Sequence, residues 1–265
     1  MPEGHTIHRL AREHRRLLVG RTVSAASPQG RFADGAARID GRRLRRVEPY
    51  GKHLFYAFSG AEPLHVHLGL YGTFVAGELP APEPRGALRL RLSTEESYVD
   101  LRGPTACELL TPPEVRSIRA RLGPDPLRRS ARPEFAWERV RISRVALGAL
   151  LLDQSVLAGV GNVYRAEILF RHRIDPHRAG RGLSEEEWQA IWSDLQLLMR
   201  AGVRAGRIVT TLPEHRNRRR GPASREDSFY VYRRTGLPCR VCGAEVRTEV
   251  MAARNLYWCP TCQAT

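Results

Sequence analysis

The sequence predicts an α+β protein of several domains, in which an N-terminal helix and a β-sandwich or barrel precede a helical region and a C-terminal β-hairpin. The hydrophobic period supports this order, because short alternating runs extend to about residue 110 and a helical period follows from about residue 131. Four of the five cysteines stand near the C-terminus as two Cys-x-x-Cys pairs. A chain of 265 residues also exceeds the usual size of a single core.

The N-terminal half begins with an amphipathic pattern. Apolar residues at helical spacing, from Ile7 to Leu18, predict a helix that stops at Gly20. Alternating runs broken by glycine and proline then predict strands at 45–48, 52–58, 64–68, 87–92 and 98–101. We therefore expect this half to be mainly β-structure.

The C-terminal half changes to a helical period. Prolines at 112–113 and 124–126 flank a short expected helix and mark a linker. Helices are expected over 135–142, 146–154 and 162–172, and a fourth begins at Ser184, where Glu187 completes a capping box. A short strand is expected at 229–232, before the cysteines.

The charge of the chain points to a polyanionic partner. The formal net charge is +15 and the isoelectric point is about 10.6. Nucleic acid is the leading candidate, and a basic surface that serves only solubility is the alternative. Lys52 is the only lysine among 43 basic residues, so it stands out. No apolar run is long enough for a membrane span and no secretory signal is visible, which predicts a cytoplasmic protein without a membrane partner.

The C-terminal cysteines have the spacing of a metal site. Four thiolates arranged as two Cys-x-x-Cys knuckles predict a closed, structural zinc site, with a redox dithiol or free thiols as the alternatives. The predicted ligands are Cys239, Cys242, Cys259 and Cys262. Cys107 stands alone and is expected to be a packing residue. Catalysis itself is expected to need no metal, because four sulfur ligands leave no position for water.

Two further segments offer chemistry. In Gly159-Val-Gly161-Asn162, two glycines precede a helix start that favours a phosphate, although most such turns only connect helices. If Met1 is removed, Pro2 presents a secondary amine of lowered pKa that attacks aldehydic carbons and forms an iminium, and Glu3 lies beside it for proton transfer. A plain terminus before a helix is the alternative. His65 and His67 are expected to be surface or DNA-facing residues rather than metal ligands.

Together these segments resemble the formamidopyrimidine-DNA glycosylase and endonuclease VIII family over nearly the whole chain. The matching segments are Pro2-Glu3-Gly4, Tyr50-Gly51-Lys52-His53-Leu54, His67-Leu68-Gly69-Leu70-Tyr71-Gly72, Leu152-Asp153-Gln154 through Gly159-Val160-Gly161-Asn162-Val163-Tyr164, and Arg254 with Tyr257-Trp258-Cys259-Pro260. The resemblance implies a β-sandwich with an N-terminal helix (residues 1–115), a linker (116–130), a helix-two-turn-helix DNA-binding domain (131–225) and a zinc finger (226–265). It also implies a DNA cleft between the domains.

The resemblance further implies roles for individual residues. Pro2 attacks C1′ of a damaged nucleoside, Glu3 moves protons, and Lys52 reaches the lesion and its phosphate. Asn162 and Arg254 hold the bent DNA backbone around a flipped nucleotide, while Leu70 and Tyr71 enter the space it leaves. The implied protein is a monomeric, bacterial, nucleoid-associated repair enzyme that binds damaged DNA, contains one structural zinc ion, and cuts the strand by β- and δ-elimination.

Two departures from the family bear on the substrate. Thr6 stands where many relatives have a second glutamate, so any catalytic task of that carboxylate is absent or supplied elsewhere. The segment Asp100–Pro104 contains one arginine and lacks the Arg-Arg-Phe of the 8-oxoguanine-specific branch. These features resemble the endonuclease VIII branch and favour oxidised pyrimidines. An 8-oxoguanine or formamidopyrimidine preference, and a non-catalytic DNA-binding protein, are the alternatives.

Overall fold

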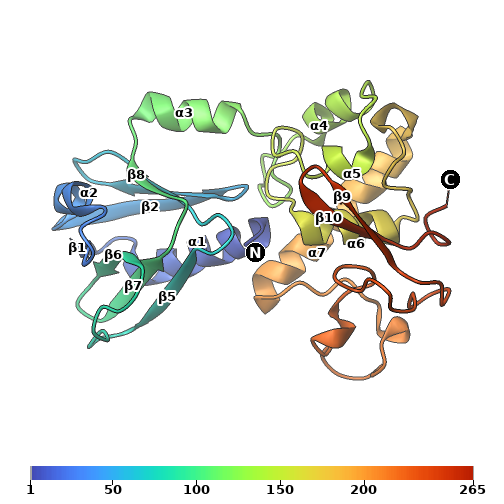
Figure 1. Cartoon of the computed structure of the whole chain (residues 1–265). Helices are drawn as coiled ribbons and strands as arrows, with labels where there is room; N and C mark the ends of the chain where they lie inside the picture. Colours follow the sequence, from blue (N-terminus) through green and yellow to red (C-terminus); the bar gives the residue numbers. More distant parts are fainter. Residues whose placement is uncertain (1, 265) are drawn as a thin grey trace. The chain divides into compact units, whose positions relative to one another are not determined.

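The computed structural model describes residues 2–264 (Figure 1). The chain divides into two compact units, Met1–Arg121 and Leu122–Thr265. Each unit has its own hydrophobic core.

The first unit is built on eight antiparallel strands in the order β5-β7-β6-β1-β2-β3-β4-β8. β1 joins the two halves of this sheet, because Thr22 and Val23 pair with β2 whereas Ser24 to Ala26 pair with β6. The strands are β1 (Thr22–Ala26), β2 (Arg42–Tyr50), β3 (His53–Phe58), β4 (Leu64–His67), β5 (Thr73–Glu78), β6 (Leu88–Ser93), β7 (Ser97–Arg102) and β8 (Ala106–Leu109).

Both halves of the sheet contribute to one core, as the alternation of apolar residues predicts. Leu54 and Val66 from β3 and β4 belong to the same buried cluster as Leu92 and Val99 from β6 and β7. The expected N-terminal β-domain is therefore confirmed.

Three helices accompany the sheet: α1 (Gly4–Leu18), α2 (Ala33–Ile39) and α3 (Pro112–Ala120). α1 buries Ile7, Ala11 and Leu18, and its His14 Nδ1 lies 2.8 Å from the Tyr56 hydroxyl of β3. The expected N-terminal helix is thus confirmed. The prolines at 112–113 differ from expectation, because they form the first turn of α3 rather than flank it; proline is tolerated there because its missing N–H has no helical partner.

The second unit contains the helices α4 (Pro133–Val140), α5 (Leu147–Leu150), α6 (Asn162–Arg171) and α7 (Glu185–Ala205). Short 3₁₀ turns are η1 (Gly180–Gly182), η2 (Pro213–His215) and η3 (Glu226–Ser228), and the hairpin consists of β9 (Arg247–Met251) and β10 (Arg254–Trp258). The capping box of Ser184 and Glu187 at the start of α7 is present as predicted. In the described part of the chain no helix has the length and apolar character needed to cross a bilayer.

The helix expected over 146–154 is much shorter than predicted. Side chains bond to several backbone groups beyond Leu150: Gln154 Nε2 donates to the Leu152 and Val160 carbonyls, and Gln154 Oε1 accepts from the Gly159 amide at 3.0 Å. Asp153 Oδ1 accepts from the Ser155 amide at 2.8 Å. Such local bonds compete with the helical ladder and turn the chain.

The strand expected at 229–232 is wrong, and the reason is a buried carboxylate. Glu167 of α6 is fully buried and accepts hydrogen bonds from the amides of Tyr230 (2.8 Å), Val231 (2.9 Å) and Tyr232 (2.8 Å), and from the Thr210 hydroxyl. Three consecutive amides that converge on one carboxylate cannot alternate as they do in a strand. The segment therefore wraps around the end of this side chain.

This arrangement predicts a large effect of removing the carboxylate. Glu167→Ala removes the carboxylate that accepts from three consecutive amides, two in buried hydrogen bonds and one in a partly buried one. We therefore expect the free energy of unfolding to fall by about 3–5 kcal/mol, at about 1–3 kcal/mol for each unsatisfied group less relaxation. Urea unfolding measures this value. Glu185→Ala, at an exposed site, is the control and should change stability by less than about 0.5 kcal/mol. A loss below about 1 kcal/mol for Glu167→Ala would contradict this account.

Candidate functional site

The predicted nucleophile and its neighbour lie at the start of α1. Pro2 is half-buried, and the Glu3 side chain is fully buried at the N-terminus of α1. The free amides and the helix dipole at this end favour a negative charge. The Glu3 carbonyl accepts from the Thr6 amide at 2.9 Å and so begins the helix. Met1, whose removal the predicted chemistry requires, lies outside the described residues.

Thr6, which replaces the family glutamate, contacts a histidine. The Thr6 hydroxyl lies 3.2 Å from His5 Nε2, and burial lowers the pKa of His5 to about 4. His5 is therefore neutral near pH 7. The position that holds a second carboxylate in many relatives thus holds an uncharged hydrogen-bonded pair.

Lys52 occupies a two-residue turn between β2 and β3. Tyr50 pairs with His53, and Gly51 has φ +55°, a left-handed conformation that glycine adopts without steric cost. Beside the turn, His53 Nδ1 lies 2.9 Å from His65 Nε2, and His65 Nδ1 lies 2.9 Å from Glu108 Oε1. Burial first, and neighbouring imidazoles, arginine and Lys52 after it, lower the pKa of His53 to about 3.

The expectation that His65 is a surface or DNA-facing residue is therefore wrong. The His65 side chain is buried between His53 and Glu108, because the pairing of β4 with β3 and β8 brings these positions together. Neutral imidazoles thus lie beside the Lys52 turn.

Leu70 and Tyr71 lie in a tight turn between β4 and β5 and are 45% and 87% exposed. The Gly72 amide donates to the Leu68 carbonyl at 3.0 Å, which closes the turn. A Cβ on Gly69 would lie 1.9 Å from the Thr105 hydroxyl, so no larger residue fits there. The turn therefore holds two large apolar side chains away from the core, an arrangement that suits insertion into another molecule.

The structure brings Asn162 and the Arg254 hairpin together. Asn162 is the first residue of α6, and its Nδ2 donates to the Asn255 carbonyl at 2.8 Å. Arg254 follows a two-residue turn in which both alanines have positive φ, +52° for Ala252 and +56° for Ala253. The Arg254 side chain is exposed and donates only to the Ala253 carbonyl next to it among the described residues.

Sequence reasoning missed Arg165, which joins these two elements. Arg165 is fully buried and donates to the carbonyls of Gly148 (3.3 Å), Met251 (3.2 Å) and Asn255 (3.1 Å), and to Asn162 Oδ1. The signal was available, because residues three apart in a helix lie on one face and Arg165 is three residues after Asn162 in the same helix.

The four predicted metal ligands converge. One ligand sulfur from each of Cys239, Cys242, Cys259 and Cys262 lies within 4.8 Å of the others, and Sγ–Sγ distances are 3.8 Å for Cys239–Cys262 and 3.5 Å for Cys242–Cys259. Tetrahedral zinc with bonds of about 2.3 Å requires sulfur separations of about 3.8 Å, so the residues fit the ion. Cys107 is remote in sequence from this group, and burial raises the pKa of its thiol to about 12, which agrees with a packing role.

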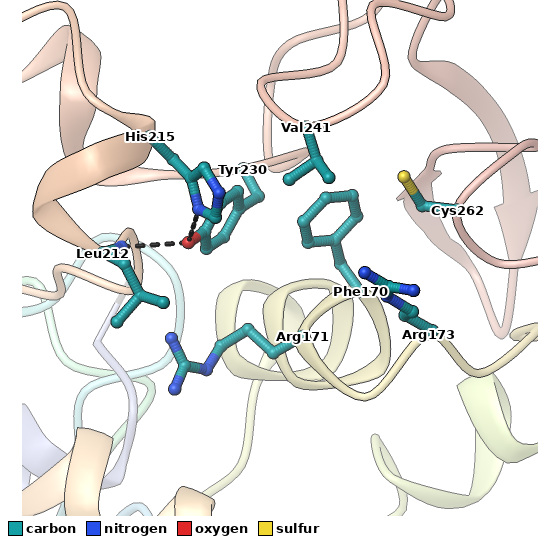
Figure 2. A pocket seen from close by; sticks show the side chains of 8 residues that line it. All are labelled: Phe170, Arg171, Arg173, Leu212, His215, Tyr230, Val241 and Cys262. Carbon is teal, nitrogen blue, oxygen red and sulfur yellow. Dashed lines mark hydrogen bonds between the residues drawn. The ribbon is translucent and has the colours of Figure 1, made fainter.

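A cavity of about 200 Å³ lies where α6 meets the zinc finger (Figure 2). Phe170 stacks on Tyr230 at a ring-centroid distance of 4.7 Å, and the Tyr230 hydroxyl accepts from the Leu212 amide at 2.9 Å. His215 Nδ1 lies 2.9 Å from the same hydroxyl. The residues that line this cavity include none of the predicted catalytic residues, and its polar contacts join the loop after α7 to Tyr230.

The predicted site residues divide between the two units. Pro2, Glu3, Lys52, Leu70 and Tyr71 belong to the first, whereas Asn162, Arg254 and the four cysteines belong to the second. Within the second unit, Asn162, Arg165 and the hairpin form one hydrogen-bonded group.

Three family models match the chain in order. The formamidopyrimidine-DNA glycosylase N-terminal domain matches residues 1–107, the formamidopyrimidine-DNA glycosylase H2TH domain matches 122–214, and the zinc finger found in FPG and IleRS matches 236–265.

Curated relatives and solved structures agree with these matches. Endonuclease 8 1 of Mycobacterium tuberculosis is 54% identical over 99% of this chain and 100% of its own length, and Formamidopyrimidine-DNA glycosylase of Thermus thermophilus is 34% identical over 99% and 98%. The structure of Lactococcus lactis Fpg with DNA containing an abasic site superimposes with a TM-score of 0.82 at 21% identity, covering 99% of this chain and 100% of that one. The chain therefore belongs to the formamidopyrimidine-DNA glycosylase and endonuclease VIII family of base-excision-repair enzymes.

Proposed function

We propose that this protein is a bifunctional DNA glycosylase and AP lyase that removes oxidised bases, pyrimidines in preference, through a Schiff base on Pro2 and cuts the strand by β,δ-elimination. The observation that supports the proposal most is the N-terminal geometry. Pro2 precedes a carboxylate that is fully buried at a helix N-terminus, in the same unit as the Lys52 turn. A buried carboxylate beside a secondary amine suits proton transfer, which favours this role over that of a plain terminus before a helix.

The proposed chemistry follows from the amine. With Met1 removed, the Pro2 nitrogen attacks C1′ and loses its proton, and the base leaves with a proton. The C1′–O4′ bond of the sugar then breaks, O4′ takes up a proton, and the resulting iminium holds a permanent positive charge. This cation makes the C2′ proton acidic, so its removal expels the 3′ phosphate, and a second elimination expels the 5′ phosphate. Glu3 and Lys52 are proposed to move the protons of these steps.

We propose that the remaining site residues hold the DNA. Asn162 and Arg254 would bind phosphates on either side of the lesion, and Arg165 fixes their separation through the Asn255 carbonyl. Leu70 and Tyr71 would fill the space left by the flipped nucleotide. One zinc ion held by the four cysteines is proposed to be structural, since the ligand set is closed.

The preference for pyrimidines is supported by the end of β7. Arg102, the single arginine that could replace the Arg-Arg-Phe segment of the 8-oxoguanine branch, pairs with Asp100 at 3.1 Å and also donates to the Arg85 carbonyl. Asp100 is buried and also pairs with Arg91 at 2.7 Å. A guanidinium held by its own sheet is poorly placed to enter the duplex. Preference for 8-oxoguanine or formamidopyrimidine is the second candidate, favoured by the 34% identical Thermus relative.

The iminium provides a direct test of the Pro2 assignment. Borohydride reduction should trap a covalent complex between the protein and DNA that contains an abasic site or an oxidised pyrimidine, and peptide mapping should place the link at Pro2. Pro2→Gly should reduce trapping severely, whereas Pro84→Gly, in an exposed loop, should not. Undiminished trapping after the terminus is blocked would rule out Pro2 as the nucleophile.

The zinc assignment predicts that loss of the metal weakens DNA binding without unfolding the β-domain. Metal analysis should find one zinc per chain, and Cys259→Ser should lose the metal and weaken DNA binding while leaving the β-domain folded, because Arg254 lies in the hairpin between the cysteine pairs. Cys107→Ser is the control and should keep the zinc. Active protein without zinc would refute the assignment.

Lys52→Arg tests whether Lys52 is more than a positive charge. Arginine binds phosphate well but does not give up a proton near neutral pH, so base excision should fall by roughly 100-fold or more. DNA affinity and cleavage of a preformed abasic site should change much less, since no base needs to leave. Single-turnover assays on both substrates measure this difference, with Arg45→Lys as the control. Excision at the wild-type rate would mean that Lys52 supplies only charge.

A further inference from the structure

The segment between α7 and the zinc finger contains an arginine cluster, Arg216-Asn217-Arg218-Arg219-Arg220, whose function the sequence leaves open. We call residues 216–220 the arginine loop. Arg218, Arg219 and Arg220 are exposed, and within residues 2–264 their guanidinium groups have no hydrogen bond or ion pair. Three like charges without partners repel one another, so they suit an anionic ligand from outside the chain.

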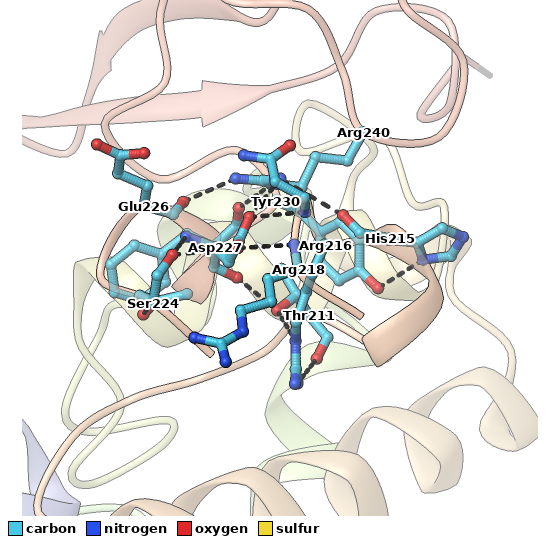
Figure 3. A network of polar contacts seen from close by, with 12 residues as sticks. Thr211, His215, Arg216, Arg218, Ser224, Glu226, Asp227, Tyr230 and Arg240 are labelled. Carbon is cyan, nitrogen blue, oxygen red and sulfur yellow. Dashed lines mark hydrogen bonds and ion pairs between the residues drawn. The ribbon is translucent and has the colours of Figure 1, made fainter. Parts of the chain in front are cut away.

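Both ends of the arginine loop converge on one carboxylate (Figure 3). Asp227 is 2% exposed, although it lies in a strongly exposed segment. Its carboxylate accepts from the Asn217 amide at 3.0 Å, at the start of the loop, and from the Ser224 hydroxyl at 3.1 Å, after its end. The carboxylate thus closes the loop at its base.

A guanidinium of the zinc finger completes the closure. Arg240 lies between the predicted zinc ligands Cys239 and Cys242, and its side chain is 6% exposed. It pairs with Asp227 at 3.1 Å and donates to the carbonyls of Glu226 (2.7 Å) and Phe229 (3.0 Å). The same guanidinium lies 3.4 Å from the His215 carbonyl, so it contacts the chain on both sides of the arginine loop.

We infer that Asp227 and Arg240 are positioning residues that hold the arginine loop on the zinc knuckle, so that Arg218, Arg219 and Arg220 bind DNA phosphates. The inference rests on the DNA function proposed above. Arginine is the residue best suited to phosphate, and a loop whose base is already ordered loses less conformational entropy on binding. We call the ion pair of Asp227 and Arg240 the clamp. Because Arg240 lies between Cys239 and Cys242, the clamp makes the position of the loop depend on the fold around these cysteines.

The first experiment removes the charges. The variant Arg218→Gln/Arg219→Gln/Arg220→Gln should reduce the slope of log Kd against log salt by about 2–3, at about 0.9 for each phosphate that the loop no longer neutralises. The control is Arg200→Gln/Arg204→Gln/Arg207→Gln, which removes equal charge from exposed positions at the end of α7 and after it. An equal change in both variants would show that the loop contributes only net charge and would overturn the inference.

The second experiment tests the clamp. Asp227→Asn should keep its zinc, make the loop more sensitive to trypsin at Arg218–Arg220, and raise the Kd for abasic-site DNA by about 2- to 10-fold, the range expected when a few side chains must be ordered on binding. Combined with the triple loop variant, Asp227→Asn should cause no further weakening, because both act through the same phosphates. Additive effects, or unchanged trypsin sensitivity, would overturn the clamp.

Two controls keep the outcome clear. Arg240→Lys keeps the charge but removes the planar fork, so it should reproduce the Asp227→Asn effects if that variant does not fold. Borohydride trapping by the wild-type protein reports the proposed lyase function independently of the loop. If wild type is trapped but the loop variants bind DNA as wild type does, the loop inference fails while the proposed function stands.

Discussion

The buried carboxylate of Glu167 is the interaction on which the architecture of the second unit depends. Burial raises its pKa, but three backbone amides and a hydroxyl stabilise the charged form, and these donors fix the path of the chain into the zinc finger. The same helix holds Asn162 and Arg165 against the hairpin. α6 thus positions two separate segments through three polar side chains, although its residues 162–170 are all buried.

The hairpin presents its exposed arginine at the cost of backbone strain. Ala252 and Ala253 both have positive φ, which costs roughly 1–2 kcal/mol for each residue that has a Cβ. Arg165 offsets part of this cost, because it donates to Met251 and Asn255 on both sides of the turn. With the cysteine knuckles at the other end of the hairpin, the turn is held from two directions, and this rigidity suits a residue that must meet a phosphate at a fixed position.

In the first unit, the distinctive charged residue is Lys52, and its neighbours are neutral histidines. The basic residues are arginines except for Lys52, and that lysine stands beside imidazoles that burial keeps neutral. Neutral imidazoles neither repel the lysine ammonium nor compete with it for phosphate. The chain of Glu108, His65 and His53 also holds the rings in place, so the turn that presents Lys52 rests on an ordered surface.

The sequence by itself determined the elements with strong local signals: the N-terminal helix, the capped α7, the alternating strands, and the cysteine spacing, which all depend on neighbours close in the chain. The motifs also singled out Pro2, Glu3, Lys52, Asn162 and Arg254. Only the tertiary structure decided the early end of α5, the missing strand at 229–232, the buried Arg165 and the clamp of Asp227 with Arg240. In each of these cases a polar side chain satisfies backbone groups that are distant in sequence or outside any periodic pattern, and hydrophobic periodicity contains no record of such bonds.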